Sequence, residues 1–120
     1  MLVAVASKSG IAIDEHFGHA RLFHIYRLDT HGCHHQEDRA VDHYCHGNTG
    51  DQSAMQKILH TIADCQAVFV SKVGDGPVEK LAARGIEAVS EYAWEEIEAG
   101  LSQYYQKQIH PKNSHEAVSP

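Results

Sequence analysis

Leu2-Val3-Ala4-Val5-Ala6 is a short apolar run, and the turn-forming stretch Ser7-Lys8-Ser9-Gly10 follows it directly. An apolar run of this length between turn residues is typical of a strand buried on both faces of a sheet. The run has no basic leader and Lys8 interrupts it early, so we expect a first strand rather than a signal peptide. A sheet built around this strand is the starting point for the fold.

Two more strands are expected to join the first one. Residues 22–28, Leu-Phe-His-Ile-Tyr-Arg-Leu, are rich in residues that favour strands. A third strand is predicted over 38–44, with the polar residues 31–37 forming the hairpin between the two. Because strands joined by tight turns pair antiparallel, these three should form an antiparallel unit.

The second half of the chain predicts two strand–helix–strand crossovers. Apolar residues at helical spacing indicate a helix over about 51–63, and a buried strand follows at 67–70. Gly74-Asp75-Gly76-Pro77 should open the next helix, and Gly85 should end it. A short strand at 87–89 completes the second crossover. Strands joined in this way lie parallel to one another.

A last helix is expected over about 92–106. Its apolar stripe consists of Trp94, Ile97, Leu101 and Tyr104. The order β-β-β-α-β-α-β-α predicts an α/β protein with a mixed five-stranded sheet and a ribonuclease H-like three-layer fold. Residues 1–106 should form one domain, and residues 107–120 are expected to be a flexible tail.

Composition excludes several classes of function. The 120-residue chain has a formal net charge of −6 and scattered basic residues, which disfavours binding to nucleic acid. No apolar run approaches the roughly 20 residues needed to cross a bilayer. Three cysteines are too few and odd in number for a disulfide framework, so we expect a reduced, cytoplasmic protein. Eleven histidines are the unusual feature.

The loop after the first strand is the first candidate site. It contains His16-Phe17-Gly18-His19, with two histidines three residues apart. Imidazole nitrogen is a good ligand for iron, zinc or copper, and Gly18 would permit a positive φ or a close approach of the backbone. The alternative is that both histidines are ordinary polar loop residues.

A second candidate is the stretch Cys33-His34-His35, with Cys45 further along the chain. These residues offer nitrogen and sulfur ligands, but adjacent strand residues point to opposite faces, so convergence on one ion requires an irregular hairpin. A solvated polar hairpin is the alternative. Cys45 is the cysteine best placed as a ligand, at the expected end of the third strand. Cys65 is expected to be buried as a small hydrophobic residue.

The third candidate is the turn that opens the helix after the fourth strand. Backbone N–H groups around Gly74 and Gly76 could hold an anion, with Lys72 adding positive charge. The turn lacks the motifs of phosphate-binding loops. Known hydrolase motifs are also absent from the sequence, and the first strand has no acidic residue, which argues against nuclease activity.

Several of these motifs together resemble one known family. They are His16-Phe17-Gly18-His19-Ala20 after the first strand, Tyr44-Cys45-His46-Gly47, Asp64-Cys65, and Gly74-Asp75-Gly76-Pro77 with Gly85-Ile86. In this order they resemble the nitrogenase iron–molybdenum-cofactor binding family, found in NifX, NafY and the C-terminal part of NifB. The resemblance covers about residues 1–106.

The resemblance implies a carrier rather than an enzyme. The cargo would be the iron–molybdenum cofactor or its iron–sulfur precursor, held through His16, with His19 and Cys45 as further ligands. Its partners would be an assembly scaffold, a cofactor synthase or apo-dinitrogenase, and the carrier would be a monomer or a weak homodimer. Cys33, His34 and His35 have no counterpart in the family.

Three alternatives remain open. The first is a metal- or cluster-binding protein of the same family that serves a system other than nitrogenase. The second is a small hydrolase on a ribonuclease H-like fold, and the third is a protein-interaction module whose histidines are incidental. A hydrolase would need converging carboxylates in the folded protein.

Overall fold

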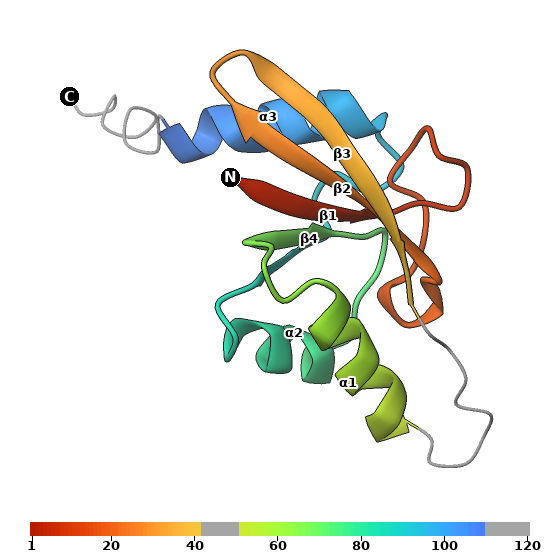
Figure 1. The fold of residues 1–120 in the computed structure, drawn as a ribbon. Coiled ribbons are helices and arrows are strands. Elements are labelled where there is room, and N and C mark those ends of the chain that lie inside the picture. Colours follow the sequence, from red (N-terminus) through yellow and green to blue (C-terminus); the bar gives the residue numbers. More distant parts are fainter. Residues whose placement is uncertain (42–50, 110–120) are drawn as a thin grey trace.

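The computed structural model describes residues 1–41 and 51–109, which contain a five-stranded sheet and three α-helices (Figure 1). The strands are β1 (Leu2–Ala6), β2 (Leu22–Asp29), β3 (Gly32–Ala40), β4 (Ala67–Phe69) and β5 (Glu87–Val89). The helices are α1 (Asp51–Thr61), α2 (Asp75–Ala82) and α3 (Ile97–Ile109), with a short 3-10 turn, η1, at Phe17–His19. The strand order is β3-β2-β1-β4-β5.

The pairing directions agree with the sequence prediction. β1 pairs antiparallel with β2 and parallel with β4, while β2–β3 is antiparallel and β4–β5 is parallel. The α/β class and the mixed five-stranded sheet are therefore confirmed. The closer likeness to ribonuclease H stays a prediction.

The helices lie on both faces of the sheet, α1 and α2 on one side and α3 on the other (Figure 1). β1 divides its side chains between these two faces. Ala4 and Ala6 belong to the core under α1 and α2, whereas Val3 and Val5 belong to the core under α3. All four are fully buried, as expected for the central strand of a three-layer protein.

Each core joins sheet residues to one helical layer. The first core includes Phe23, Ile25, Val68, Ile58, Leu59, Ile62, Cys65 and Leu81. The second includes Leu28, Phe69, Val89, Ile97, Leu101 and Tyr104. The predicted burial of Cys65 is confirmed. Tyr104 also donates a hydrogen bond from its hydroxyl to the Glu87 carboxylate, 2.7 Å away, which ties α3 to β5.

The third strand is where the sequence prediction was wrong. Residues 31–37 were expected to be a hairpin loop, but β3 begins at Gly32 and takes in most of this polar stretch. β3 is an edge strand of the described sheet, and most of its side chains are exposed or half-buried. An edge strand needs no apolar alternation to be stable, so the polar composition was misleading. Residues 42–44 of the predicted strand lie outside the described residues.

The start of the last helix was also misplaced. α3 begins at Ile97 rather than near residue 92, and Trp94 has a φ of +71° with 66% of its surface exposed. The backbone here bonds to the loop after β1 instead of forming a helical turn. Trp94 N–H donates to the carbonyl of Ile13, and Ile13 N–H donates to the carbonyl of Glu95, both at 2.9 Å. Trp94 is therefore no part of the apolar stripe.

At its other end α3 runs to Ile109, so residues 107–109 are helical rather than part of a tail. Residues 110–120 lie outside the described residues, and the expected tail stays a prediction there. None of the described helices has the length and apolar character needed to cross a bilayer.

Leu101 provides a test of the packing under α3. The substitution Leu101→Ala should lower the free energy of unfolding by about 2–5 kcal/mol, because it empties a fully buried position in this core. Gln106→Ala, at an exposed position on the same helix, should change it by about 0.5 kcal/mol or less. Urea denaturation of the three proteins measures both effects. Similar midpoints for all three would contradict the placement of α3 against the sheet.

Candidate functional site: a histidine loop at one end of the sheet

A hydrogen-bonded turn around Asp14 shapes the loop after β1. The carboxylate oxygen Oδ1 of Asp14 accepts hydrogen bonds from the backbone N–H groups of Lys8 (2.7 Å) and Ser9 (3.3 Å) and from the Ser7 hydroxyl (3.3 Å). Burial raises the pKa of Asp14, but these donors favour the charged form more strongly and leave the pKa below its usual value. The charged carboxylate therefore holds the first half of the loop in place.

The second half of the loop is bonded to the connection between β4 and α2. Ser71 N–H donates to the carbonyl of Glu15, and Phe17 N–H donates to the carbonyl of Lys72, both at 2.9 Å. His16 and Lys72 thus face each other in a short parallel bridge. The Phe17 side chain is buried in the core under α1 and α2. His16 is held between these attachments rather than carried on a loose segment.

The structure brings the two predicted histidines together. The rings of His16 and His19 stack with their centroids 5.2 Å apart and their planes 19° apart, one at the start and one at the end of η1. His16 is half-buried and His19 is exposed. Neither ring forms a hydrogen bond with another described residue. The pair therefore presents imidazole nitrogens that an incoming metal could use.

The glycines of the site do not act as the sequence suggested. Gly18 has no positive φ, and a Cβ atom built there would meet nothing within 4 Å. Gly76 is equally open, and at Gly74 only the Cδ atom of Pro77 would lie close, at 3.7 Å. Neither backbone conformation nor crowding within the described residues requires glycine at these positions. What they provide is open space beside the histidine loop and at the start of α2.

The predicted anion cradle lies next to the histidine loop. Gly74 is the N-cap of α2, and Pro77 stands in the first turn, as predicted. Lys72 lies in the connection between β4 and α2, and its side chain is exposed. The backbone carbonyl of Lys72 accepts the hydrogen bond from Phe17 N–H. Unpaired N–H groups at a helix start favour an anion, although Asp75 in the first turn offsets part of that effect.

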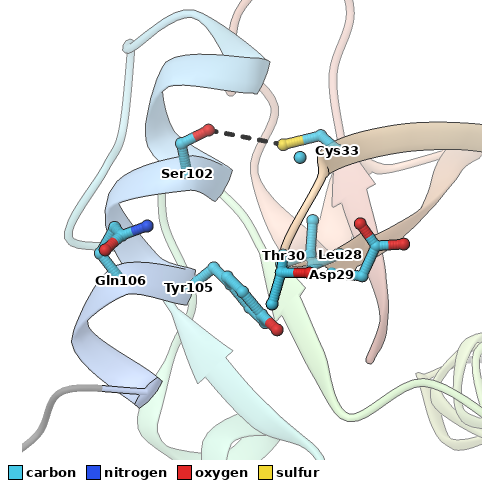
Figure 2. A pocket seen from close by; sticks show the side chains of 8 residues that line it. Leu28, Asp29, Thr30, Cys33, Ser102, Tyr105 and Gln106 are labelled. Carbon is cyan, nitrogen blue, oxygen red and sulfur yellow. Dashed lines mark hydrogen bonds between the residues drawn. The ribbon is translucent and has the colours of Figure 1, made fainter.

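The three consecutive candidates on β3 point to different partners. The Cys33 thiol lies near the hydroxyl of Ser102, 3.6 Å away, beside a cavity of about 210 Å³ between the β2–β3 hairpin and α3 (Figure 2). A ring nitrogen of His34 lies 3.1 Å from Asp29, and a ring nitrogen of His35 lies 2.7 Å from Asp38. The structure thus does not bring Cys33, His34 and His35 together into one set of ligands.

Burial disfavours the charged form of both described cysteines. It raises the pKa of Cys33 and raises the pKa of Cys65 to about 12, which favours the neutral thiol in the metal-free protein. Cys45 lies outside the described residues, and its expected role as a ligand stays a prediction.

Sequence reasoning did not select His24 and Asp38, which the structure places beside His35. Their spacing along the chain matches no ligand motif. Only the register of the β2–β3 hairpin could have revealed them, and that register contains a local irregularity between Ile25 and Tyr26.

Fold and site together define a small α/β domain with a pair of surface histidines beside a helix start. Residues 1–107 match the model of a protein family described as dinitrogenase iron-molybdenum cofactor. The chain therefore belongs to this family, as its motifs indicated.

The relatives fall into two groups. The FeMo cofactor biosynthesis protein NifB of Herbaspirillum seropedicae is 41% identical over 105 residues, which are 88% of this chain but 20% of that protein. The chain thus spans about a fifth of the length of this curated relative. Two solved structures share the fold. PH0822 has a TM-score of 0.66, 18% identity and coverage of 88% and 91% of the two chains. A putative dinitrogenase from Methanocaldococcus jannaschii has a TM-score of 0.56, 15% identity and 90% coverage of both.

The Asp14 turn gives a prediction about pH. Because the folded-state pKa of Asp14 is lowered, its stabilising effect is complete above the unfolded value of 3.8 and is lost as pH falls through the folded value. Asp14→Asn should therefore lower the free energy of unfolding by about 1 kcal/mol or more near neutral pH. This difference should shrink in acid. Urea titrations of parent and variant at about pH 7 and about pH 3 measure it. An equal difference at both pH values would contradict the role of the charged carboxylate.

Proposed function

We propose that the protein is a carrier that binds an iron–sulfur nitrogenase cofactor, or its precursor, through His16. The cargo is of the iron–molybdenum cofactor type, and the protein hands it to an assembly scaffold or to apo-dinitrogenase. The observation that supports this most directly is the stacked pair His16 and His19 on a loop bonded to the connection between β4 and α2. Membership of the family supports the choice of cargo.

The ligand chemistry of the loop suits transient binding. Imidazole binds iron, yet one or two imidazoles form far fewer bonds than a closed cage of thiolates. The backbone of His16 is held in place by its neighbours' hydrogen bonds, so little backbone conformational entropy is lost when the residue binds. Few ligands and a rigid support together favour binding that is specific and still reversible.

Local charge adds a second attraction. An iron–sulfur cofactor with net negative charge held by His16 would lie close to Lys72, the bridge partner of His16, and to the N–H groups at the start of α2, which follow Lys72 along the chain. The absence of side chains at Gly18 and Gly76 leaves room for a bulky cluster. The negative charge of the whole chain opposes this attraction, which makes the local groups more important.

A carrier role also fits the chemistry that the loop offers. His16 and His19 can bind and release, and β1 supplies no carboxylate of the kind that a nuclease of this topology would use. We therefore propose a non-enzymatic role in the cytoplasm, with a cofactor synthase as the source of the cargo.

His16→Ala should weaken binding of the isolated cofactor by at least roughly 10–100-fold. Loss of a residue that only supports a metal ligand already has an effect of this size. The variant should keep the parent's circular-dichroism spectrum, because the ring makes no hydrogen bond with another described residue. Anaerobic incubation with the cofactor, gel filtration and iron determination measure the bound cluster.

His34→Ala is the matched control, because His34 is also half-buried but lies on β3. It should retain as much iron as the parent. Equal retention of iron by His16→Ala and the parent would remove His16 from the site.

A second experiment mixes the cofactor-loaded parent protein with apo-dinitrogenase. No movement of iron to apo-dinitrogenase would contradict the carrier role.

A further inference from the structure

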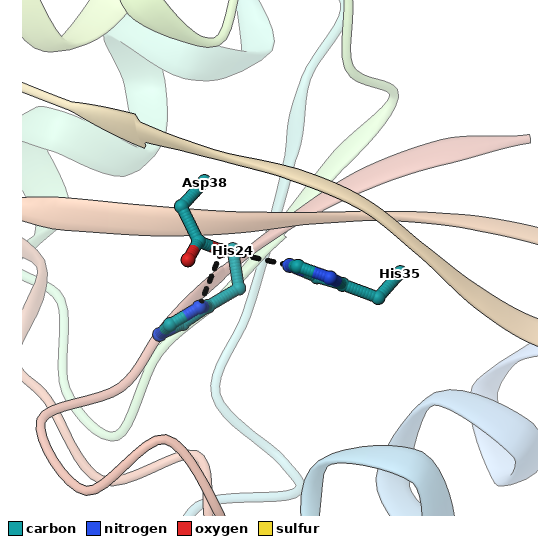
Figure 3. Close-up of side chains that lie close together, drawn as sticks. All are labelled: His24, His35 and Asp38. Atoms are coloured by element: carbon teal, nitrogen blue, oxygen red, sulfur yellow. Dashed lines mark hydrogen bonds and ion pairs between the residues drawn. The ribbon is translucent and has the colours of Figure 1, made fainter.

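A group of three side chains outside the histidine loop has the composition of a metal site. His24 on β2 and His35 and Asp38 on β3 place their ligand atoms within 4.8 Å of one another (Figure 3). We propose that these residues bind one divalent first-row transition metal ion, of the class of Zn(II) or Fe(II), independently of His16. The proposal does not rest on the carrier function.

A β-bulge brings the three residues to one face of the sheet. His24 pairs with Asp38 and Tyr26 pairs with His35, while the register shifts between Ile25 and Tyr26 so that β3 has one extra residue. In a regular strand, residues three apart point to opposite faces. The extra residue puts His35 and Asp38 on the same face, which also carries His24.

The distances already connect the three side chains. Oδ1 of Asp38 lies 2.8 Å from Nδ1 of His24 and 2.7 Å from Nε2 of His35 (Figure 3). Ligand atoms bonded to one ion at about 2.0–2.1 Å stand about 3.0 Å apart in an octahedral site and about 3.3 Å apart in a tetrahedral one. Each Asp38–histidine pair must therefore widen by a few tenths of an ångström, and the two imidazole nitrogens, which lie within 4.8 Å of each other, must turn toward the ion.

The surroundings allow this adjustment while limiting other motion. The side chain of His24 is 15% exposed, whereas those of His35 and Asp38 are 48% and 42% exposed. His24 is thus held by its neighbours, and the other two can move toward an ion. The ring of Tyr26 lies against His35 with centroids 5.2 Å apart and restricts its rotation. The exposed side leaves positions on the ion for water or an exchanging ligand.

The donor set selects the class of metal. Two imidazoles and one carboxylate suit zinc, iron(II), cobalt or nickel, whereas calcium and magnesium prefer sites made of oxygen atoms. The carboxylate also supplies negative charge that lowers the cost of bringing a cation to the strand pair. Without an ion, the same atoms can form hydrogen bonds with one another. The hydrogen-bonded state and the ion-bound state are therefore alternatives, and a titration with metal distinguishes them.

Titration with Co(II), followed by competition with Zn(II), tests the proposal on the whole chain. Visible absorption reports Co(II) bound to nitrogen and oxygen, and atomic analysis after gel filtration counts the ions. The parent should bind one ion per chain that is lost in the double variant His24→Ala, His35→Ala. Asp38→Asn should weaken that ion's binding by about ten-fold or more, since the amide keeps the shape of the side chain but not its charge.

Two controls separate this site from the remaining histidines. His34→Ala removes the neighbouring histidine on β3, which bonds to Asp29 instead, and His16→Ala removes the proposed cofactor ligand. Both should retain the ion with unchanged affinity. If the double variant is poorly folded by circular dichroism, His35→Ala alone, at a half-exposed position, replaces it. The proposal would be overturned if the double variant, or His35→Ala in its place, bound the ion as tightly as the parent. It would also be overturned if His34→Ala lost the ion to the same extent as that variant.

Discussion

The pairing of β1 on both sides determines where the candidate site of this protein lies. From Val3 to Ala6, β1 is fully enclosed between two helical layers, so its backbone groups must find partners in neighbouring strands, β2 on one side and β4 on the other. Because β1 and β4 are parallel, the loops that follow their carboxyl ends emerge at the same end of the sheet. One loop carries His16 and the other carries Lys72 and Gly74. The hydrogen bonds that join these two loops, through Glu15 and Phe17, follow from that arrangement.

Much of this framework could be predicted from the sequence because burial leaves a clear pattern. The apolar runs at β1 and β4 are strands in the structure, and Gly85 has the positive φ of 79° expected just after a helix. β3 could not be predicted in the same way. It lies at an edge of the described sheet with little apolar surface, so its residues resemble those of a loop. Trp94 shows the other limit, since hydrogen bonds to a distant loop overrode its helical spacing.

The candidate site was predicted in part. The loop motif drew attention to His16 and His19, whose rings stack in the structure while their role as ligands stays a prediction, and the start of α2 lies where Gly74 and Pro77 suggested. The prediction for Gly18 was wrong, since the residue has neither a positive φ nor a close backbone approach and provides only open space. His24 and Asp38 could not be found, because a single extra residue in β3 determines which side chains share a face. Such an irregularity leaves no periodic signal in the sequence.

The polar character of β3 has a further consequence for how copies of the protein meet. An edge strand with unpaired backbone groups can recruit a second sheet and begin aggregation. Along β3 the exposed side chains include Glu37 and Asp38, and the bulge breaks the regular spacing that an added strand would need to match. At the opposite edge, β5 has three residues and offers little length for pairing. Both borders of the described sheet therefore discourage growth into fibrils.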